Sequence, residues 1–176
     1  MTVFTAIQKA ALRVDGSNLD QAFASTEQIA VELCDLVNDV ATDVMKSHDW
    51  RALTKIQTIS VDGVTTEFPL PPDYDRMLLA SSMHDKTSWF WNYYAMPTVD
   101  DWITWKNSNG AWLWPGAWII MGQSFHFNPA PVDDANYPYV SNLYARSTGG
   151  TPKAEFTQDD DTFVLDERLL TLGLEY

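Results

Sequence analysis

Residues 25–45, STEQIAVELCDLVNDVATDVM, are the most regular stretch of the sequence and decide its fold class. Apolar side chains recur there every three or four residues, which is the period of an amphipathic helix. Ser25 and Gln28 have the spacing of a capping box and predict where the helix begins. The predicted apolar stripe consists of Ile29, Leu33, Leu36, Val37, Val40, Val44 and Met45. The opposite face carries the carboxylates of Glu27, Glu32, Asp35, Asp39 and Asp43.

Helices are also predicted near both ends of the sequence. Residues 2–14 have the same helical period and stop before Asp15 and Gly16. Toward the other end, Asp166 is the expected N-cap of a leucine-rich helix. A helix of about ten residues is marginal in water by itself, so we expect it to pack on the 29–45 stripe or on a neighbouring chain. Its leucines are Leu169, Leu170, Leu172 and Leu174.

Between residues 53 and 164 the pattern becomes typical of β-strands. Asp62 and Gly63 separate two β-branched runs, at 53–61 and 64–68, and predict a hairpin. A short helix is expected to begin near Pro97 and Thr98. Further strands are expected within residues 77–82, 88–94, 111–131 and 139–146, with a turn at residues 122–124.

Together these elements predict an α+β fold, in which N-terminal and C-terminal helices pack together with a central antiparallel β-rich region. At 176 residues the chain is expected to form a single domain. Its helical base would comprise residues 1–50 and 166–176, and its β-rich middle residues 51–165.

Charge and cysteine content exclude several classes of protein. The formal net charge is −13, from 24 acidic and 11 basic residues, which is the wrong sign for tight binding to nucleic acid. No apolar run approaches the roughly 18 residues that cross a bilayer, and no signal-peptide pattern is present, so we expect neither membrane insertion nor secretion. The single cysteine, Cys34, favours synthesis in a reducing cytoplasm.

Local motifs of catalytic or metal sites are absent from the sequence, so we expect no enzyme activity, no cofactor and no metal. Residues 159–161 lack the alternating ligands of a calcium loop, and we interpret this acidic run as a solvated loop. His48, His84 and His126 do not have the spacing of metal ligands. No basic residue flanks Cys34 to activate its thiol. A hydrolase that used dispersed carboxylates would depend on long-range contacts.

Four segments carry a resemblance to a known family. Residues 48–78, HDWRALTKIQTISVDGVTTEFPLPPDYDRML, place a tryptophan between a helix and a hairpin, followed by an LP-D turn. The other segments are WIIMGQSFHFNPAPV at 118–132, LYAR at 143–146 and DDDTFVLDERLLTLGL at 159–174. They cover most of the chain from about residue 25, and they resemble the head-to-tail connector, or adaptor, proteins of tailed bacteriophages.

This resemblance implies a structural virion protein of the neck, at the head–tail interface, that turns over no substrate. It implies a homo-oligomeric ring of twelve copies, with the portal protein above and a neck, stopper or tail protein below. DNA would pass through the ring without specific binding. Assembly would take place in the host cytoplasm.

The eight tryptophans of the chain predict extensive burial, in a core or at an interface. Trp89, Trp91 and Tyr93, with the four leucines of the last helix, are candidate partner contacts. The alternative is a carbohydrate- or receptor-binding tail module with exposed tryptophan platforms. We favour core and interface, because the tryptophans fall on both faces of the predicted strands.

Asp35, Asp39 and Asp43 are candidates for the acidic lining of a DNA channel. Carboxylates in that position would repel phosphates that come within the Debye length of about 8 Å. The duplex would then slide without sticking.

Overall fold

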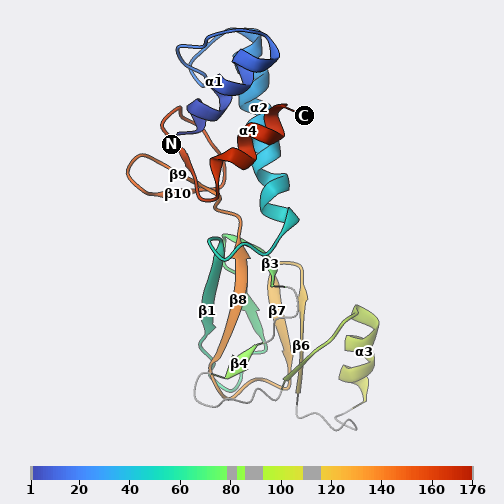
Figure 1. Cartoon of the computed structure of the whole chain (residues 1–176). Helices are drawn as coiled ribbons and strands as arrows, with labels where there is room; N and C mark the ends of the chain where they lie inside the picture. The colour runs from blue at the N-terminus through green and yellow to red at the C-terminus, as the bar shows by residue number, and fades with distance from the viewer. Residues whose placement is uncertain (1, 79–82, 86–92, 109–115, 176) are drawn as a thin grey trace. The chain divides into compact units, whose positions relative to one another are not determined.

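The computed structural model describes residues 2–78, 83–85, 93–108 and 116–175. Tertiary contacts divide the chain into two compact units (Figure 1). Unit 1 joins residues 1–54 to residues 140–176, and unit 2 is residues 55–139. Residues 140–165 therefore group with the terminal helices. The single adaptor-like domain expected from the sequence stays a prediction.

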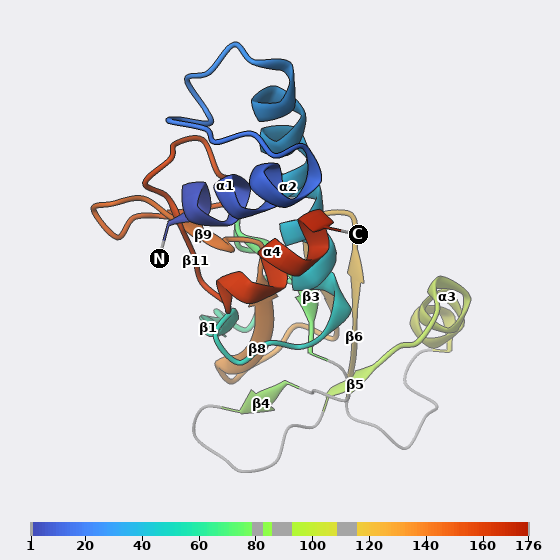
Figure 2. The same cartoon turned by 45° about the horizontal axis from the view of Figure 1, so that its top comes forward.

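Unit 1 is built on α1 (Val3–Val14), α2 (Gln28–Ser47) and α4 (Glu167–Glu175). Both α1 and α4 contact α2, and they contact each other (Figure 2). The predicted packing of N-terminal and C-terminal helices is thus confirmed, and α4 docks on its own chain. The buried line of α2 consists of Ala30, Leu33, Val37, Ala41 and Met45.

The buried face and the beginning of α2 differ from the prediction. Leu36, placed in the predicted stripe, is 42% exposed, whereas Ala30 and Ala41 are fully buried. Small alanine side chains allow the helices to approach closely. A prediction that selects the most hydrophobic residues does not place such alanines in the buried face. The predicted capping box is also wrong, because the N-cap is Glu27 and makes no side-chain cap hydrogen bond. The hydroxyl of Ser25 accepts the N–H of Glu27 instead.

The start and the docking of α4 have clear local causes. The Asp166 carboxylate accepts the N–H of Arg168 at 2.9 Å, which confirms the predicted N-terminal cap. Gly173 faces Val40 of α2, and a Cβ added to Gly173 would lie 2.4 Å from Cγ1 of that valine. Glycine therefore allows α4 to approach α2 this closely.

A small sheet completes unit 1. Its strand order is β10-β9-β11, and β9 runs antiparallel to both neighbours. The rings of Tyr144, Phe156 and Phe163 contact one another beside it, with centroids 5.5 to 6.3 Å apart. The strands are β9 (Ala145–Arg146), β10 (Pro152–Lys153) and β11 (Thr162–Phe163).

The strands of unit 2 form two sheets within the described residues. One has the order β1-β8-β3, with β4 also paired to β8, and the other has the order β2-β7-β6-β5. The first contains β1 (Thr54–Ile59), β3 (Tyr74–Met77), β4 (His84–Asp85) and β8 (Ala135–Ser141). The second contains β2 (Glu67–Pro69), β5 (Tyr93–Ala95), β6 (Gly116–Met121) and β7 (Ser124–Asn128). Antiparallel pairing links β2, β7 and β6, whereas β5 runs parallel to β6.

Side chains from both sheets share an aromatic core. The rings of Phe125 and Tyr137 meet edge to face with centroids 4.7 Å apart, a favourable geometry for aromatic pairs. The short helix α3 (Val99–Asn107) packs Trp102 and Trp105 against β6. Its predicted start is confirmed, because the Thr98 side chain accepts the N–H of Asp101 at 3.1 Å. The core consists of Ile59, Met83, Trp118, Phe125, Phe127, Ala135, Tyr137 and Tyr139.

Two strand predictions are wrong. β1 and β2 lie in different sheets and do not form the predicted hairpin. The Asp62 carboxylate accepts the N–H groups of Val64 and Thr65, which makes a capped turn that leads from one sheet to the other. Residues 139–146 are divided between β8 and β9, which also belong to different sheets.

The remaining strand predictions have mixed outcomes. The hairpin of β6 and β7 is confirmed, and Gly122 at its turn has φ +61°, a left-handed conformation that favours glycine. β3 ends at Met77, where the prediction had a strand begin. Residues 79–82 and 88–92 of two predicted strands lie outside the described residues, apart from the segment that begins β5 at Tyr93.

The α+β class is confirmed by this arrangement of helices and largely antiparallel sheets. A search of the described helices finds none that is both long and apolar enough to span a membrane.

Candidate functional site

Four carboxylates follow one another along α2, and we call them the acidic row: Glu32, Asp35, Asp39 and Asp43. All four side chains are exposed. Their three- and four-residue spacing is offset by half a turn from Leu33 and Val37, so the row lies opposite the buried line. Within the described part of the chain, no basic group pairs with the three aspartates. The predicted lining residues therefore form one exposed surface.

The predicted contact leucines of α4 divide between the interior and the surface. Leu170 and Leu174 are 0% and 4% exposed and belong to the core of unit 1. Leu169 is half-buried. Leu172 is 40% exposed and so offers a partner the larger apolar surface.

A groove of about 650 Å³ lies between α1 and α4, and we call it the α1–α4 groove. Leu165 and Leu172 contribute apolar surface to it. Three exposed basic residues, Lys9, Arg13 and Arg168, also line it. These are three of only 11 basic residues in a chain whose net charge is −13, so the groove gathers an unusual share of the positive charge.

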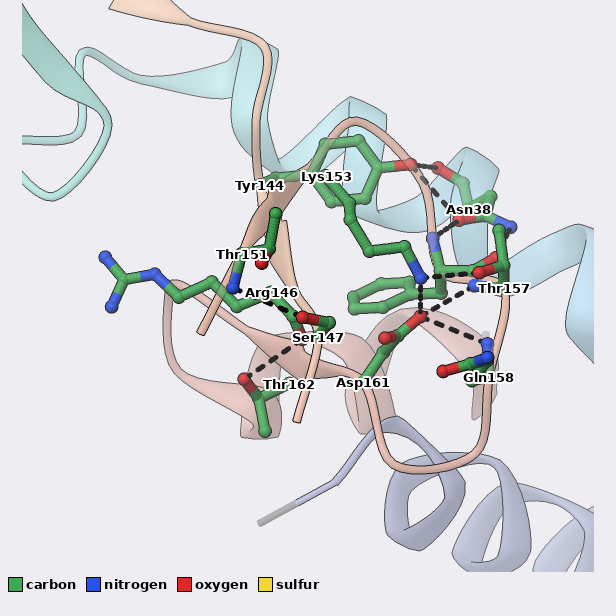
Figure 3. Close-up of polar contacts among 11 residues, drawn as sticks. Asn38, Tyr144, Arg146, Ser147, Thr151, Lys153, Thr157, Gln158, Asp161 and Thr162 are labelled. Carbon is green, nitrogen blue, oxygen red and sulfur yellow. Dashed lines mark hydrogen bonds and ion pairs between the residues drawn. The ribbon is translucent and has the colours of Figure 1, made fainter. Parts of the chain in front are cut away.

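A buried carboxylate holds the loop that precedes α4 (Figure 3). Asp161 is fully buried, and its Oδ2 accepts hydrogen bonds from the Lys153 ammonium and from the N–H groups of Thr157 at 2.8 Å and Gln158 at 3.0 Å. Burial by itself opposes ionisation of Asp161, but these donors outweigh it and lower the pKa of the carboxyl group. Asp161 is therefore a charged structural anchor.

Asn38 and Asp159 tie the same loop to the rest of unit 1. Asn38 Oδ1 accepts the N–H of Phe156 at 2.8 Å, and its Nδ2 donates to the Phe156 carbonyl at 3.2 Å. The Tyr144 hydroxyl donates to the same Oδ1 at 3.2 Å (Figure 3). The Asp159 carboxylate accepts the N–H of Phe23 at 3.0 Å. The loop and the elements beside the groove thus form one connected structure.

The solvated-loop interpretation of residues 159–161 is wrong for two of the three aspartates. The carbonyls of Asp159 and Asp161 accept the N–H groups of Phe4 and Val3, in the first turn of α1 where helical N–H groups lack partners. Asp160 is exposed, as interpreted. Local patterns did not reveal this, because Phe23 and the N-terminus of α1 are more than 130 residues away in sequence.

The structure describes only part of the aromatic segment that was predicted to contact a partner. Trp89 and Trp91 lie outside the described residues, and Tyr93 is half-buried in β5. The Tyr93 hydroxyl donates to the Ala130 carbonyl at 3.0 Å, and burial, with a smaller effect of Asp133, raises its pKa. Tyr93 therefore packs on unit 2 and keeps part of its side chain at the surface.

The described tryptophans of unit 2 are interior residues. Trp102, Trp105 and Trp118 are between 3% and 7% exposed. Trp105 also donates its indole N–H to the Asn128 carbonyl at 3.2 Å. Because their rings are covered, these three cannot serve as stacking platforms for a sugar.

Chemically reactive groups do not converge in the described part of the chain. No group of three or more histidine, cysteine or acidic side chains with the arrangement of a metal site occurs among the described residues. Burial, with a smaller contribution from Asp159, raises the pKa of the Cys34 thiol to about 11. That thiol is protonated near neutral pH and is a poor nucleophile.

Comparison with families of known proteins gives one match across residues 1–176, to a family described as SU10 adaptor protein. No curated protein matches the sequence.

Proposed function

The chain belongs to the SU10 adaptor protein family, and on this basis we propose that it forms a ring under the portal that connects the phage head to the neck or tail. Membership indicates a structural adaptor of the virion that associates with other head and tail proteins. The finer features of the proposal are twelve copies, a portal above, a neck, stopper or tail protein below, assembly in the host cytoplasm, and a channel for DNA. The match over the whole chain carries the proposal.

Two physical features support a ring subunit. In a heterologous contact, one patch of a subunit meets a different patch of the next subunit, and such contacts generate rings. Unit 1 carries two such different patches, the acidic row and the α1–α4 groove. The net charge of −13 also suits a protein that DNA passes without sticking.

The channel-lining role of Asp35, Asp39 and Asp43 stays a prediction. Their exposure on one side of α2 meets its first requirement. The predicted partner contacts at Tyr93 and Leu172 likewise have exposed surface available.

We propose a non-enzymatic role in line with the family, which describes an adaptor. The raised pKa of the Cys34 thiol makes it a poor nucleophile, and the Asp161 carboxylate is bound within its own chain by Lys153 and two N–H groups. The carbohydrate-binding alternative gains no support from the described tryptophans, whose rings are buried.

Electron microscopy of the intact particle tests this function directly. We expect density for a ring of this chain in the neck, with one face on the portal and the other on the next neck or tail protein. Native mass spectrometry of the purified chain, alone and with its portal, should then give the copy number. Density at the tail tip, or an absence of the chain from the neck, would contradict the proposal.

A further inference from the structure

The α1–α4 groove and the acidic row lie on opposite sides of unit 1. The buried line of α2 faces α1 and α4, and the acidic row projects from the other side of the same helix. The groove is lined by residues of α1 and α4, the helices that cover the buried line, and by the segment that precedes α4. A contact between the groove of one copy and the row of the next would therefore join copies head to tail.

The groove combines apolar surface with basic side chains. Leu172 is 40% exposed there, and the half-buried Leu165 lies beside it. Arg168 is exposed and makes no ion pair within the described residues. Arg13 pairs with Glu175 of its own chain. Arg168 is thus the basic group most available to a partner.

Carboxylates of the same chain also lie at the groove. Asp166 caps α4 through the N–H of Arg168, and Glu167 lines the groove in the first turn of that helix. Negative charge at a helix N-terminus is favourable, so these groups have a role within the chain. The three basic and two acidic residues that line the groove leave a net charge of +1, and Glu175 pairs with Arg13, so the positive charge that faces a partner is local and centred on Arg168.

The acidic row also lies beside an exposed leucine, but its charges are negative. Leu36 is 42% exposed beside the carboxylates of Glu32, Asp39 and Asp43. The row from Glu32 to Asp43 spans roughly 16 Å at the rise of an α-helix. Lys46, one turn further on, is the next charged residue of this helix and is basic. An exposed leucine among carboxylates is the complement of an exposed leucine among basic residues.

We propose that the acidic row of one copy docks in the α1–α4 groove of the next copy, with Leu36 against Leu172 and carboxylates beside Arg168 and Lys9. This inference rests on the proposed function, since it names the contact by which the ring closes. Opposite-side, heterologous contacts produce a ring or a filament, not an isolated two-fold dimer. Because exposed ion pairs are weak and screened by salt, the contact should weaken as salt is raised.

Charge reversal on each surface tests the contact. The groove variant is K9E/R168E, and the row variant is D39K/D43K. In K9E/R168E the groove carries the same sign as the row, and in D39K/D43K two lysines meet the basic side chains where two carboxylates stood, so half-assembly of either variant should require a concentration about tenfold higher or more. A chain with all four substitutions again has opposite charges at the exchanged positions, with carboxylates at positions 9 and 168 against ammonium groups at positions 39 and 43, and should assemble again. An equimolar mixture of the two variants should also assemble, into rings in which they alternate.

Control substitutions separate this contact from a general effect of charge. K106E and D100K reverse exposed charges on α3 and should leave assembly unchanged. Circular dichroism should show that every variant is folded, and native mass spectrometry of the full chain, with portal where rings need it, reads out assembly.

The outcomes distinguish failure of this contact from failure of the proposed function. Rings that persist in K9E/R168E and in D39K/D43K would overturn the contact and leave the proposed function standing. Intact D39K/D43K rings with altered DNA passage would overturn it in favour of a channel-lining row. A wild-type chain that forms no ring, alone or on the portal, would overturn the proposed function itself.

Discussion

Asp161 has no contact with solvent and yet keeps its charge, because Lys153 and two backbone N–H groups all donate to one of its oxygens. Its neighbour Asp160 is exposed. The two aspartates therefore provide a matched pair for measuring what the anchor contributes.

We predict that D161N destabilises unit 1 by about 2 to 4 kcal/mol, since it removes the charged acceptor that Lys153, Thr157 and Gln158 share at a fully buried position. D160N should change the free energy of unfolding by less than about 0.5 kcal/mol. Urea unfolding followed by circular dichroism measures both. Equal effects of the two substitutions would contradict the anchor role.

The contribution of Asp161 to stability has a defined pH dependence. The pKa of Asp161 is lower in the folded chain than the unfolded value of about 3.9. Its contribution is therefore complete above about pH 4 and is lost as the pH falls through the folded pKa. The stability difference between wild type and D161N should be constant near neutrality and shrink below about pH 4.

For single residues, the sequence predicted a structural role only where the hydrogen-bond partner of the residue lies a few positions away in the chain. Asp166 was identified as a cap, and the start of α3 was placed near Thr98, because the partners of both side chains lie two or three residues away. Asp161 and Asn38 were missed, since the network that they join depends on the tertiary fold. The groove was missed for the same reason, as Lys9 and Arg168 are far apart in the chain.

The close contact between helices α2 and α4 depends on glycine, which has no side chain, at position 173. A Cβ at Gly173 would lie 2.4 Å from Val40, whereas one at Gly149 would have its nearest neighbour at 3.9 Å. Helix propensity alone favours alanine over glycine by about 1 kcal/mol. For the substitution G173A, packing therefore predicts a loss of stability and helix propensity predicts a gain.

We predict that packing wins and that G173A destabilises unit 1 by about 1 to 3 kcal/mol. Thermal unfolding gives the stability, and the rate of tryptic cleavage after Arg168 reports the release of α4. Adding V40A should recover much of the loss, because it removes the atoms that clash. G149A is the control. A G173A chain as stable as wild type would show that Val40 moves aside easily.

Element types were more predictable than their partners. Helical periodicity located α1, α2 and α4, because each buries one continuous face. The Asp62 hairpin was wrong, since an aspartate that caps a longer turn looks the same in sequence as one in a two-residue hairpin. Likewise, the alternation across residues 139–146 continues while the chain passes from one sheet to another.

At the scale of the molecule, the two units have different sensitivities to pH. Unit 2 holds four tyrosines whose pKa is raised, in each case chiefly by burial: Tyr74, Tyr93, Tyr137 and Tyr139. The pKa of Tyr139 reaches about 12, with a further contribution from its hydrogen bond to Asp73. Unit 1 holds Tyr144, whose pKa is also raised by burial.

A raised tyrosine pKa gives stability that is present below the unfolded value of about 10 and is lost as the pH rises through the folded value. We therefore predict that unit 2 loses protection first above about pH 10. Below about pH 4 unit 1 should lose protection first, because Asp161 is buried, whereas Asp62, the carboxyl group of unit 2 whose pKa is lowered to about 2, is exposed. Pulsed hydrogen exchange at a common labelling pH, after incubation at each extreme, measures this peptide by peptide. Simultaneous loss in both units at both extremes would show that they do not open independently.

Unit 1 is assembled from both ends of the chain, with residues 55–139 inserted between its two parts. On the ribosome, all of unit 2 is synthesised before β9, β11 and α4. Until then the apolar line of α2 lacks one of the two helices that cover it, and the groove does not exist. If neighbouring copies dock in that groove, as we propose, a chain that terminates early lacks the surface its neighbour needs, and truncated fragments would be kept out of the ring.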